Sequence, residues 1–237
     1  MKSETFGSIA LVGSGEYLPS MVEIERLLLQ GKPPLYVQIP TAATGESASR
    51  IQYWVDLGRQ QAERLGVEAL PLVIKDRSQA NDPSIAEKIL GAGLIYLSGG
   101  DPRLLVDTLK GTLVERAIVD AWSSGSSLAG CSAGAMAIGG WVVGFRHLPP
   151  HSYDGLSILP KIAIIPHFDR AIGRLPEFIS SRSFRPPDGV TLIGVDEETA
   201  IVGGVETFTV MGKGSAWVFE DNGLQQYRAN ETIELVK

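Results

Sequence analysis

Short apolar runs alternate with longer amphipathic stretches through the first two thirds of the chain. Each run has the length of a β-strand, is bounded by Gly or Pro, and is apolar at consecutive positions, as strands covered on both faces are. The predicted strands are Ile9–Val12, Leu35–Ile39, Leu70–Ile74, Leu94–Leu97 and Ser127–Gly130. The stretches between them have helical spacing, and the predicted helices are Met21–Gln30, Ser47–Leu65, Ile85–Leu90 and Leu104–Ser123. This order predicts an α/β three-layer sandwich around a mostly parallel sheet with right-handed crossovers.

The pattern changes after Val190, where the apolar runs become brief and alternate with polar positions. Turn signals such as Gly203-Gly204 and Asn222-Gly223 separate the runs, which we interpret as antiparallel strands that extend the same sheet. These runs are Leu192–Val195, Ala200–Val202, Phe208–Met211, Ala216–Phe219 and Ile233–Val236. Because we find no internal repeat and no linker, we expect a single domain over residues 1–237.

Composition narrows the class of protein. The 237 residues are 44% hydrophobic and 20% charged, which excludes a disordered acidic chain. Lys and Arg number 21 against 27 Asp and Glu, and a net charge of −6 without a basic cluster argues against nucleic acid as a partner. The single cysteine, Cys131, excludes an intrachain disulfide and a multi-cysteine metal site. Because no apolar run reaches membrane-span length and the N-terminus lacks a signal-peptide pattern, we expect a cytoplasmic protein without a membrane partner.

The segment Gly130-Cys131-Ser132-Ala133-Gly134 matches the pattern G-x-S-x-G directly after a predicted strand. A serine at such a strand-to-helix turn has a strained backbone, and its hydroxyl stands clear at the carboxyl edge of the sheet as a nucleophile. The N–H groups of the helix start, which begins with small residues, can stabilise an oxyanion there. The competing interpretation is a Gly- and Ser-rich turn that closes a βα unit. Cys131 precedes the apex of the turn, so we expect it to be buried and to point away from the edge that Ser132 faces.

A serine nucleophile needs a base, and the chain contains three histidines. His147 and His151 flank two prolines in a segment rich in turn signals, and we interpret both as solvated loop residues. His167 follows the apolar run Ile162–Ile165, so it lies at the end of a predicted strand, at the edge where Ser132 is expected. Ligands and chemistry gather outside the carboxyl ends of such strands, which makes His167 the candidate base. A histidine that only caps the strand or the following helix is the alternative.

A third group should orient the imidazole and stabilise its charged form. The candidates are Asp154, Asp169 and the cluster Asp196-Glu197-Glu198. Asp169 is two residues from the candidate base and is expected to cap the next helix. Because side chains alternate along a strand, Glu197 shares a face with Val195, while its two acidic neighbours point the other way. Three consecutive acids are commonly a solvated turn, so the pattern alone does not single out one of them.

Two further Gly-rich turns follow predicted strands. In Ser98-Gly99-Gly100-Asp101-Pro102 the paired glycines let backbone N–H groups approach a ligand, and Gly100 is a candidate for the second oxyanion donor. A tight βα turn is the alternative interpretation, and the two are compatible. Gly13-Ser14-Gly15 is like the start of a dinucleotide-binding loop, but Leu18 occupies the position of the third glycine. We therefore do not predict a bound dinucleotide cofactor.

Together these segments resemble the peptidase E and cyanophycinase family of serine peptidases. The likeness extends over about residues 8 to 202. The resemblance implies a flavodoxin-like fold similar to the class I glutamine amidotransferase domain, with a sheet between helical layers. The matching segments, in the family's order, are Val12–Gly15, Ile39–Ala42, Leu97–Asp101, Gly130–Ala135, Pro166–Phe168 and Gly194–Ala200.

The resemblance also implies roles for individual residues. The family's nucleophile, base and acid match Ser132, His167 and Glu197, so the resemblance selects the acid that alternation leaves open. It further implies that the N–H groups of Gly100 and Ala133 are the oxyanion donors.

The chain departs from the family's pattern where substrate is bound. Cyanophycinases carry a glutamine after the Gly-Gly turn and its acidic residue, where this chain has Pro102 after Asp101. The arginine with which dipeptidase E holds an N-terminal aspartate has no clear counterpart, and Arg170, with Arg174 behind it, is nearest in position. A guanidinium can hold a carboxylate through two hydrogen bonds, so Asp101, Arg170 and Arg174 are the candidate substrate-binding residues. An exposed arginine at a helix start is the equally weighted alternative.

These observations predict a serine peptidase that acts on short peptides with an acidic N-terminal residue or a β-aspartyl bond. One alternative is another acyl hydrolase that uses Ser132, Asp154 and His167. The other is an amidotransferase-like domain that binds a ligand without turnover. The sequence implies no metal and no organic cofactor, and the expected partner is a small peptide. It does not fix the number of subunits, for which a homodimer is one option.

Overall fold

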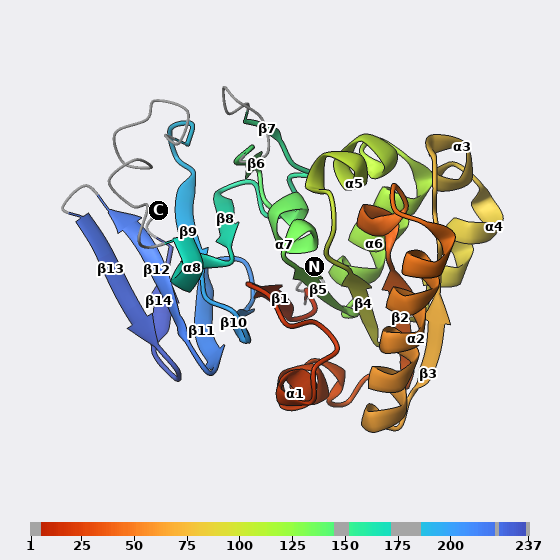
Figure 1. The fold of residues 1–237 in the computed structure, drawn as a ribbon, viewed down its shortest axis with the longest axis horizontal. Coiled ribbons are helices and arrows are strands. Elements are labelled where there is room, and N and C mark those ends of the chain that lie inside the picture. Colours follow the sequence, from red (N-terminus) through yellow and green to blue (C-terminus); the bar gives the residue numbers. More distant parts are fainter. Residues whose placement is uncertain (1–5, 145–151, 172–185, 221–222, 236–237) are drawn as a thin grey trace, which may run out of the picture.

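The computed structural model describes residues 6–144, 152–171, 186–220 and 223–235 (Figure 1). Its strands form an eight-stranded sheet, a four-stranded sheet and a short separate pair. The eight-stranded sheet contains, in spatial order, β14 (Thr232–Glu234), β11 (Thr207–Gly212), β10 (Thr199–Gly203), β1 (Ile9–Val12), β5 (Ser127–Cys131), β4 (Leu94–Leu97), β2 (Leu35–Ile39) and β3 (Glu68–Pro71). The four-stranded sheet contains β13 (Gly223–Arg228), β12 (Ser215–Glu220), β9 (Thr191–Val195) and β8 (Ile162–Pro166). The short pair consists of β6 (Trp141–Val142) and β7 (Tyr153–Asp154).

The larger sheet is parallel from β1 to β3 and antiparallel from β1 to β14. This confirms the predicted mostly parallel α/β sheet with antiparallel strands added from the C-terminal part of the chain. The parallel strands β1, β2, β4 and β5 are buried almost throughout, which is why they appear in the sequence as nearly continuous apolar runs.

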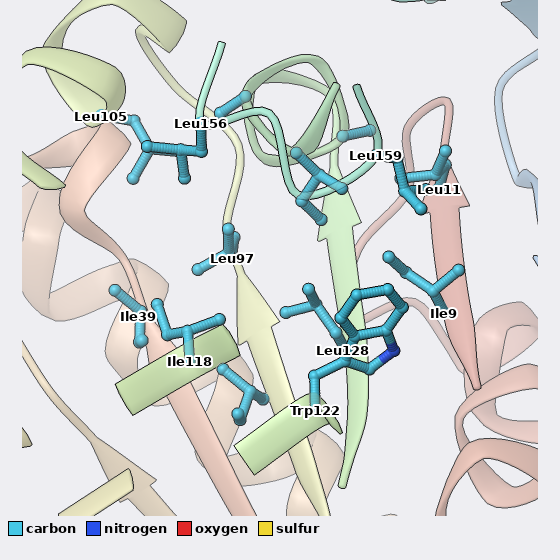
Figure 2. Close-up of a cluster of buried hydrophobic side chains, with 14 of the residues drawn as sticks. Ile9, Leu11, Ile39, Leu97, Leu105, Ile118, Trp122, Leu128, Leu156 and Leu159 are labelled. Atoms are coloured by element: carbon cyan, nitrogen blue, oxygen red, sulfur yellow. The ribbon is translucent and has the colours of Figure 1, made fainter. Parts of the chain in front are cut away.

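Helices cover both faces of the parallel part. On one face, α5 (Pro102–Leu109), α6 (Leu113–Ser123) and α7 (Ala133–Ile138) pack against strand residues such as Ile9, Leu97 and Leu128 (Figure 2). On the other face, α1 (Val22–Leu29) and α2 (Ala48–Leu65) pack against alternate residues of the same strands. Each fully buried Leu or Ile side chain contributes about 1.5–3 kcal/mol, so these two interfaces hold the layers together.

The ends of α2 follow the sequence signals closely. The Ser47 side chain accepts a hydrogen bond from the Arg50 N–H, and Gly66 ends the helix with a φ of 71°. The two short helices α3 (Arg77–Ala80) and α4 (Pro83–Ala86) begin at Asp76 and Asp82, whose side chains cap them in the same way. Polar side chains therefore determine where these three helices begin, because they accept hydrogen bonds from N–H groups that have no partner within the helix.

The long helix predicted over Leu104–Ser123 is two helices, α5 and α6. The break falls at Gly111, whose φ is 75°, and at Thr112, whose hydroxyl accepts a hydrogen bond from the Glu115 N–H. The Glu115 carboxylate reaches back and accepts the Gly111 N–H at 2.5 Å. This reciprocal cap starts a new helix where the apolar spacing continues without interruption.

Three other predicted boundaries also shift. The strand predicted over Leu70–Ile74 is β3, Glu68–Pro71. The helix predicted over Ile85–Leu90 divides into α4 and a 3-10 turn over Glu87–Ile89, and the first helix begins with the 3-10 turn Pro19–Met21 before α1. A proline or a local cap determines where a short helix or strand begins or ends, and the spacing of apolar residues does not predict these positions.

The prediction that every C-terminal strand extends the main sheet is wrong for two of the predicted runs. Leu192–Val195 and Ala216–Phe219 belong to β9 and β12 of the smaller sheet, where β9 pairs with β8 in parallel and with β12 antiparallel. The run Ile162–Ile165 before His167 likewise lies in this sheet, as β8. A third hydrophobic cluster, which includes Phe168 and Leu192, packs on this sheet. One face of the smaller sheet packs on this cluster, and residues of its other face, such as Ile164 and Ile193, belong to the main core.

One acidic side chain lies within the apolar layer between α1 and the main sheet. Glu25 is 2% exposed, and the side chains of Tyr36 and Gln61 lie around its carboxyl group. Burial raises the pKa of this carboxyl from 4.5 to about 8, so the group is mostly protonated at neutral pH.

Among the described residues, no helix is both long enough and apolar enough to span a bilayer.

Candidate active site

Ser132 occupies the turn between β5 and α7 with a strained backbone. Its φ of 49° and ψ of −107° lie outside the helical and extended regions, which costs on the order of 1–3 kcal/mol. The flanking glycines are needed for packing. A methyl group on Gly130 would lie 2.5 Å from the carbonyl carbon of Gly134, and one on Gly134 would lie 2.1 Å from the carbonyl oxygen of Leu97. The two glycines therefore let the chain turn sharply enough to present Ser132 at the end of the sheet.

His167 approaches the Ser132 hydroxyl from the smaller sheet. It directly follows β8, and its Nε2 atom lies 2.7 Å from Ser132 Oγ, which is hydrogen-bonding distance. Its φ of 134° is rare for a residue with a side chain, and the imidazole is 43% exposed. The structure thus brings together the serine and the histidine that the sequence pairs.

Phe168 fixes the backbone beside this histidine. Its ring is fully buried and lies against Gly194 of β9, where a methyl group would be 2.4 Å from the Phe168 Cγ atom. The ring also contacts the Trp217 and Phe219 rings of β12, at centroid distances of 5.8 and 5.6 Å. Phe168 is the first residue of α8 (Phe168–Ala171), and this packing fixes its position. His167, which directly precedes it, therefore has little freedom to move away from the site.

Glu197 contacts the other imidazole nitrogen. Its Oε1 atom lies 3.1 Å from His167 Nδ1, and its Oε2 atom forms an ion pair with Arg170 Nη2 at 2.8 Å. Its backbone N–H donates to Asp169 Oδ1 at 3.1 Å. Glu197 and His167 meet because β8 and β9 are parallel and in register, with Pro166 opposite Val195, so both strands release their next residues at the same edge.

The two acids beside Glu197 have structural partners of their own. Asp196 is buried, and its carboxylate accepts hydrogen bonds from the Ser215 N–H and the Trp217 indole N–H. Burial raises the pKa of the Asp196 carboxyl, against the lowering effect of these hydrogen bonds. Glu198 accepts a hydrogen bond from the Ser20 hydroxyl at 2.6 Å and pairs with Lys213 at 2.6 Å. The three consecutive acids therefore face three different surroundings, and only Glu197 contacts the imidazole among the described residues.

The turn after β4 lies in the same cleft. Gly100 has a φ of 141° and passes so close to the chain at Ala42 that a methyl group would lie 2.3 Å from the Ala42 carbonyl oxygen. Asp101 caps α5, since its carboxylate accepts the Arg103 and Leu104 N–H groups at 2.8 and 3.2 Å. The carboxylate of Asp101, predicted to bind substrate, is therefore engaged in starting a helix.

Ala133 is the first residue of α7, next to Ser132. The first N–H groups of a helix have no acceptor within the helix and carry the positive end of its dipole. This N–H directly follows Ser132 along the chain, and Gly100 lines the same cleft as the serine.

A cleft of about 400 Å³ opens in front of Ser132 and His167. Its lining includes the two glycines Gly99 and Gly100 and, on the α2 side, the aromatic residues Tyr53 and Trp54. The cleft is large enough for a dipeptide, and part of its wall is aromatic.

The sequence analysis missed one residue of this cleft, Glu16. Its Oε1 atom accepts the Gly99 N–H at 2.9 Å, and its Oε2 atom accepts a hydrogen bond from the Cys131 thiol at 2.8 Å. Cys131 is fully buried, as predicted, and burial raises the pKa of its thiol well above the ordinary value. The only signal in the sequence was its place shortly after the predicted strand Ile9–Val12, because the pairing of β1 with the strand that carries Ser132 is visible only in the structure.

The remaining candidates lie elsewhere. Asp154 is 82% exposed on β7 and pairs with Lys110 at 3.7 Å, so it makes no contact with His167. His147, His151 and Arg174 lie outside the described residues. Within the part of the chain that the structure describes, no three His, Cys, Asp or Glu side chains cluster closely enough to hold a metal ion.

The chain matches known proteins over most of its length. The model of peptidase family S51 matches residues 9–211. A cyanophycinase of Synechococcus elongatus is 30% identical over 158 residues, which are 63% of this chain and 48% of the cyanophycinase. An uncharacterized peptidase of Listeria innocua is 31% identical over 121 residues, which are 51% of this chain and 54% of that peptidase. The chain thus spans about half the length of the curated relatives that it matches.

Two solved structures are similar in fold. A peptidase from an acI-B1 actinobacterium has a TM-score of 0.87 and 40% identity, with 98% of each chain covered. A putative peptidase E from Listeria monocytogenes EGD-e has a TM-score of 0.60 and 19% identity, with 94% of this chain and 99% of that chain covered. The second similarity shows the fold alone.

Proposed function

The chain belongs to peptidase family S51, a family of serine peptidases, and on that premise we propose that it hydrolyses short peptides through Ser132, His167 and Glu197. One observation carries the proposal. Ser132 Oγ lies 2.7 Å from His167 Nε2, and His167 Nδ1 lies 3.1 Å from Glu197 Oε1, so hydroxyl, imidazole and carboxylate form one continuous chain. This is the arrangement that nucleophilic catalysis by serine requires.

In the proposed mechanism Ser132 Oγ attacks the scissile carbonyl carbon while His167 Nε2 accepts the hydroxyl proton. The C–N bond then breaks, and the same proton passes from Nε2 to the leaving amine. Water attacks the resulting ester with His167 again as base, which releases the acid and restores the serine. Glu197 accepts the hydrogen bond from Nδ1–H throughout and stabilises the imidazolium form.

The negative charge of the tetrahedral intermediate would be received by the N–H groups of Gly100 and Ala133. The position of both residues beside Ser132 supports this assignment, as does the helix start at Ala133. Loss of one such donor in serine hydrolases lowers kcat by about 10²–10³.

Peptides with an acidic N-terminal residue or a β-aspartyl bond are the proposed substrates. Arg170 supports this choice, since its guanidinium is 75% exposed and lies at the edge of the site, 2.8 Å from Glu197 Oε2. A guanidinium has five N–H groups, so it can keep this contact and still bind a substrate carboxylate. A panel of dipeptides that differ only in the N-terminal residue would test the preference.

An acyl hydrolase that uses Asp154 as its acid is disfavoured, because Asp154 is exposed and paired with Lys110. A domain that binds a ligand without turnover is distinguished by experiment. Wild type should hydrolyse members of the dipeptide panel and react with a fluorophosphonate probe, whereas Ser132→Ala should do neither. Ser49→Ala, on the exposed part of α2, is the matched control and should behave as wild type. A wild-type protein that fails in both assays would contradict the proposal.

A further inference from the structure

Asp196 lies where the chain passes from one sheet to the other. β9 ends at Val195 in the smaller sheet, β10 begins at Thr199 in the larger one, and Asp196 is the first residue of the connection. Its main chain passes against the residue after β1, because a methyl group on Gly13 would lie 2.2 Å from the Asp196 carbonyl oxygen. β1 is the direct neighbour of β5, the strand that leads to Ser132. Asp196 therefore lies at the boundary between the strands that carry the nucleophile and those that carry the base.

The carboxylate of Asp196 is buried and holds the neighbouring strand β12. The residue is 8% exposed, and its two oxygens accept hydrogen bonds from the Ser215 N–H at 2.8 Å and from the Trp217 indole N–H at 3.0 Å. The main-chain N–H of Asp196 donates to the Ser215 carbonyl oxygen at 3.1 Å. A buried carboxylate is costly unless such hydrogen bonds compensate it, and the loss of one leaves a buried polar group without a partner. The position of Asp196 relative to β12 is therefore closely determined.

Trp217 connects this carboxylate to the residue beside the base. Its ring lies 5.8 Å from the ring of Phe168, measured between centroids, and Phe168 directly follows His167 in the chain. On its other side, Asp196 is joined by a peptide bond to Glu197, whose Oε1 atom lies 3.1 Å from His167 Nδ1. One buried carboxylate is thus linked to the acid through the main chain and to the base through two packed rings.

We propose that Asp196 is a positioning residue for the reaction, which holds Glu197 and His167 at the correct distance from the nucleophile. The inference rests on the proposed function and adds a residue that acts through the other three. Asp196 is not among the described residues that line the cleft, and both of its carboxylate oxygens are bonded to N–H donors of β12, so it takes no part in proton transfer. A displacement of about 1 Å at the reacting atoms can lower a rate by about 10²-fold, so the loss of these hydrogen bonds should act mainly on kcat.

Asp196→Asn keeps the shape of the side chain but turns an NH2 group toward one of the two N–H donors. We expect kcat for the best substrate of the dipeptide panel to fall on the order of 100-fold, with KM within about threefold of wild type. The same substitution in a Glu197→Gln background should lower kcat by less than about tenfold, because an acid without its charge gains little from being positioned. Asp76→Asn is the matched control and should leave both constants unchanged, since the Asp76 carboxylate likewise accepts a backbone N–H, that of Gln79, but at the start of α3.

Trp217→Phe tests the same hydrogen bond from the side of the donor and keeps an aromatic ring against Phe168. It should lower kcat on the order of tenfold, which corresponds to one hydrogen bond to a charged group. Thermal unfolding establishes that each variant is folded at the assay temperature. If Asp196→Asn does not fold, Trp217→Phe decides the question.

Several results would overturn the inference. One is an unchanged kcat in folded Asp196→Asn or, where that variant does not fold, in folded Trp217→Phe. Another is a loss that appears in KM alone, and a third is an equal loss of kcat with and without the Glu197 carboxylate, which would indicate a general structural role. Active wild type with an equally active Asp196→Asn contradicts this inference only. Wild type that neither hydrolyses the panel nor reacts with the fluorophosphonate probe contradicts the proposed function as well.

Discussion

Glu25 on α1 makes the stability of the fold depend on pH. Burial raises the pKa of its carboxyl to about 8, against the smaller opposing effects of Gln61 and Tyr36, whereas the ordinary value of 4.5 applies in the unfolded chain. Between these two values the folded protein holds a proton that the unfolded protein releases. The free energy of unfolding therefore falls as the pH rises through this window.

The change in the free energy of unfolding follows from the pH interval between the two pKa values of Glu25. The free energy of unfolding changes by about 1.4 kcal/mol per pH unit, so Glu25 alone removes about 3 kcal/mol between pH 5 and pH 7. For a chain of 237 residues this corresponds to a decrease in Tm of about 6 to 12 °C. Glu25→Gln keeps the shape of the side chain and does not titrate. We expect the Tm of the variant, relative to wild type, to rise by this amount over the same interval.

Thermal unfolding followed by circular dichroism at pH 5, 6, 7 and 8 measures this difference. Glu23→Gln is the matched control, because Glu23 lies on the same helix with its side chain 79% exposed, and its Tm should follow wild type at every pH. A difference in Tm between Glu25→Gln and wild type that stays constant from pH 5 to pH 8 would refute the argument, since it would mean that Glu25 has the same pKa in both states.

Three further outcomes are expected. Glu197→Gln should lower kcat by about 10³–10⁴ while Asp154→Asn leaves it unchanged, as steady-state hydrolysis would show; equal effects would contradict the assignment of the acid. Gly134→Ala should lower the free energy of unfolding in urea by about 2 kcal/mol or more, because its methyl group would lie 2.1 Å from the Leu97 carbonyl oxygen, and an unchanged midpoint would be inconsistent with this packing. Cys131 is fully buried, so it should react with a thiol reagent only after denaturation, and rapid labelling of the native protein would show that this environment is wrong.

The apolar pattern predicted the parallel strands β1, β2, β4 and β5 well because these strands are buried on both faces, and it misplaced β3, which lies at the edge of the sheet and is only partly buried. It did not predict the pairing of β9 and β12 in a second sheet. Side-chain alternation states which face of a strand is buried and leaves open which strand lies beside it. The break between α5 and α6 could have been anticipated, since Thr112 and Glu115 have the spacing of a helix cap after a glycine.

In the candidate site, too, some residues could be predicted from the sequence and others could be found only in the structure. Ser132 and His167 could be proposed from local sequence, because each directly follows an apolar strand. Glu197 could not be chosen from its acidic neighbours without the family resemblance, since what separates the three is their tertiary partners. Glu16 had no motif of its own, and its place in the cleft depends on the pairing of β1 with β5, which joins residues far apart in the chain.

Ser132 is carried by the eight-stranded sheet, whereas His167 and Glu197 are carried by the four-stranded one. The 2.7 Å contact between hydroxyl and imidazole therefore spans a seam between two sheets, which are packed together by one core that includes Ile9 and Ile164. A shift of one sheet against the other by a single atomic diameter would break proton transfer and leave every strand intact. On heating, turnover should accordingly be lost before the circular dichroism of the backbone changes, and the most effective route to a heat-tolerant enzyme would be to reinforce the seam instead of either sheet.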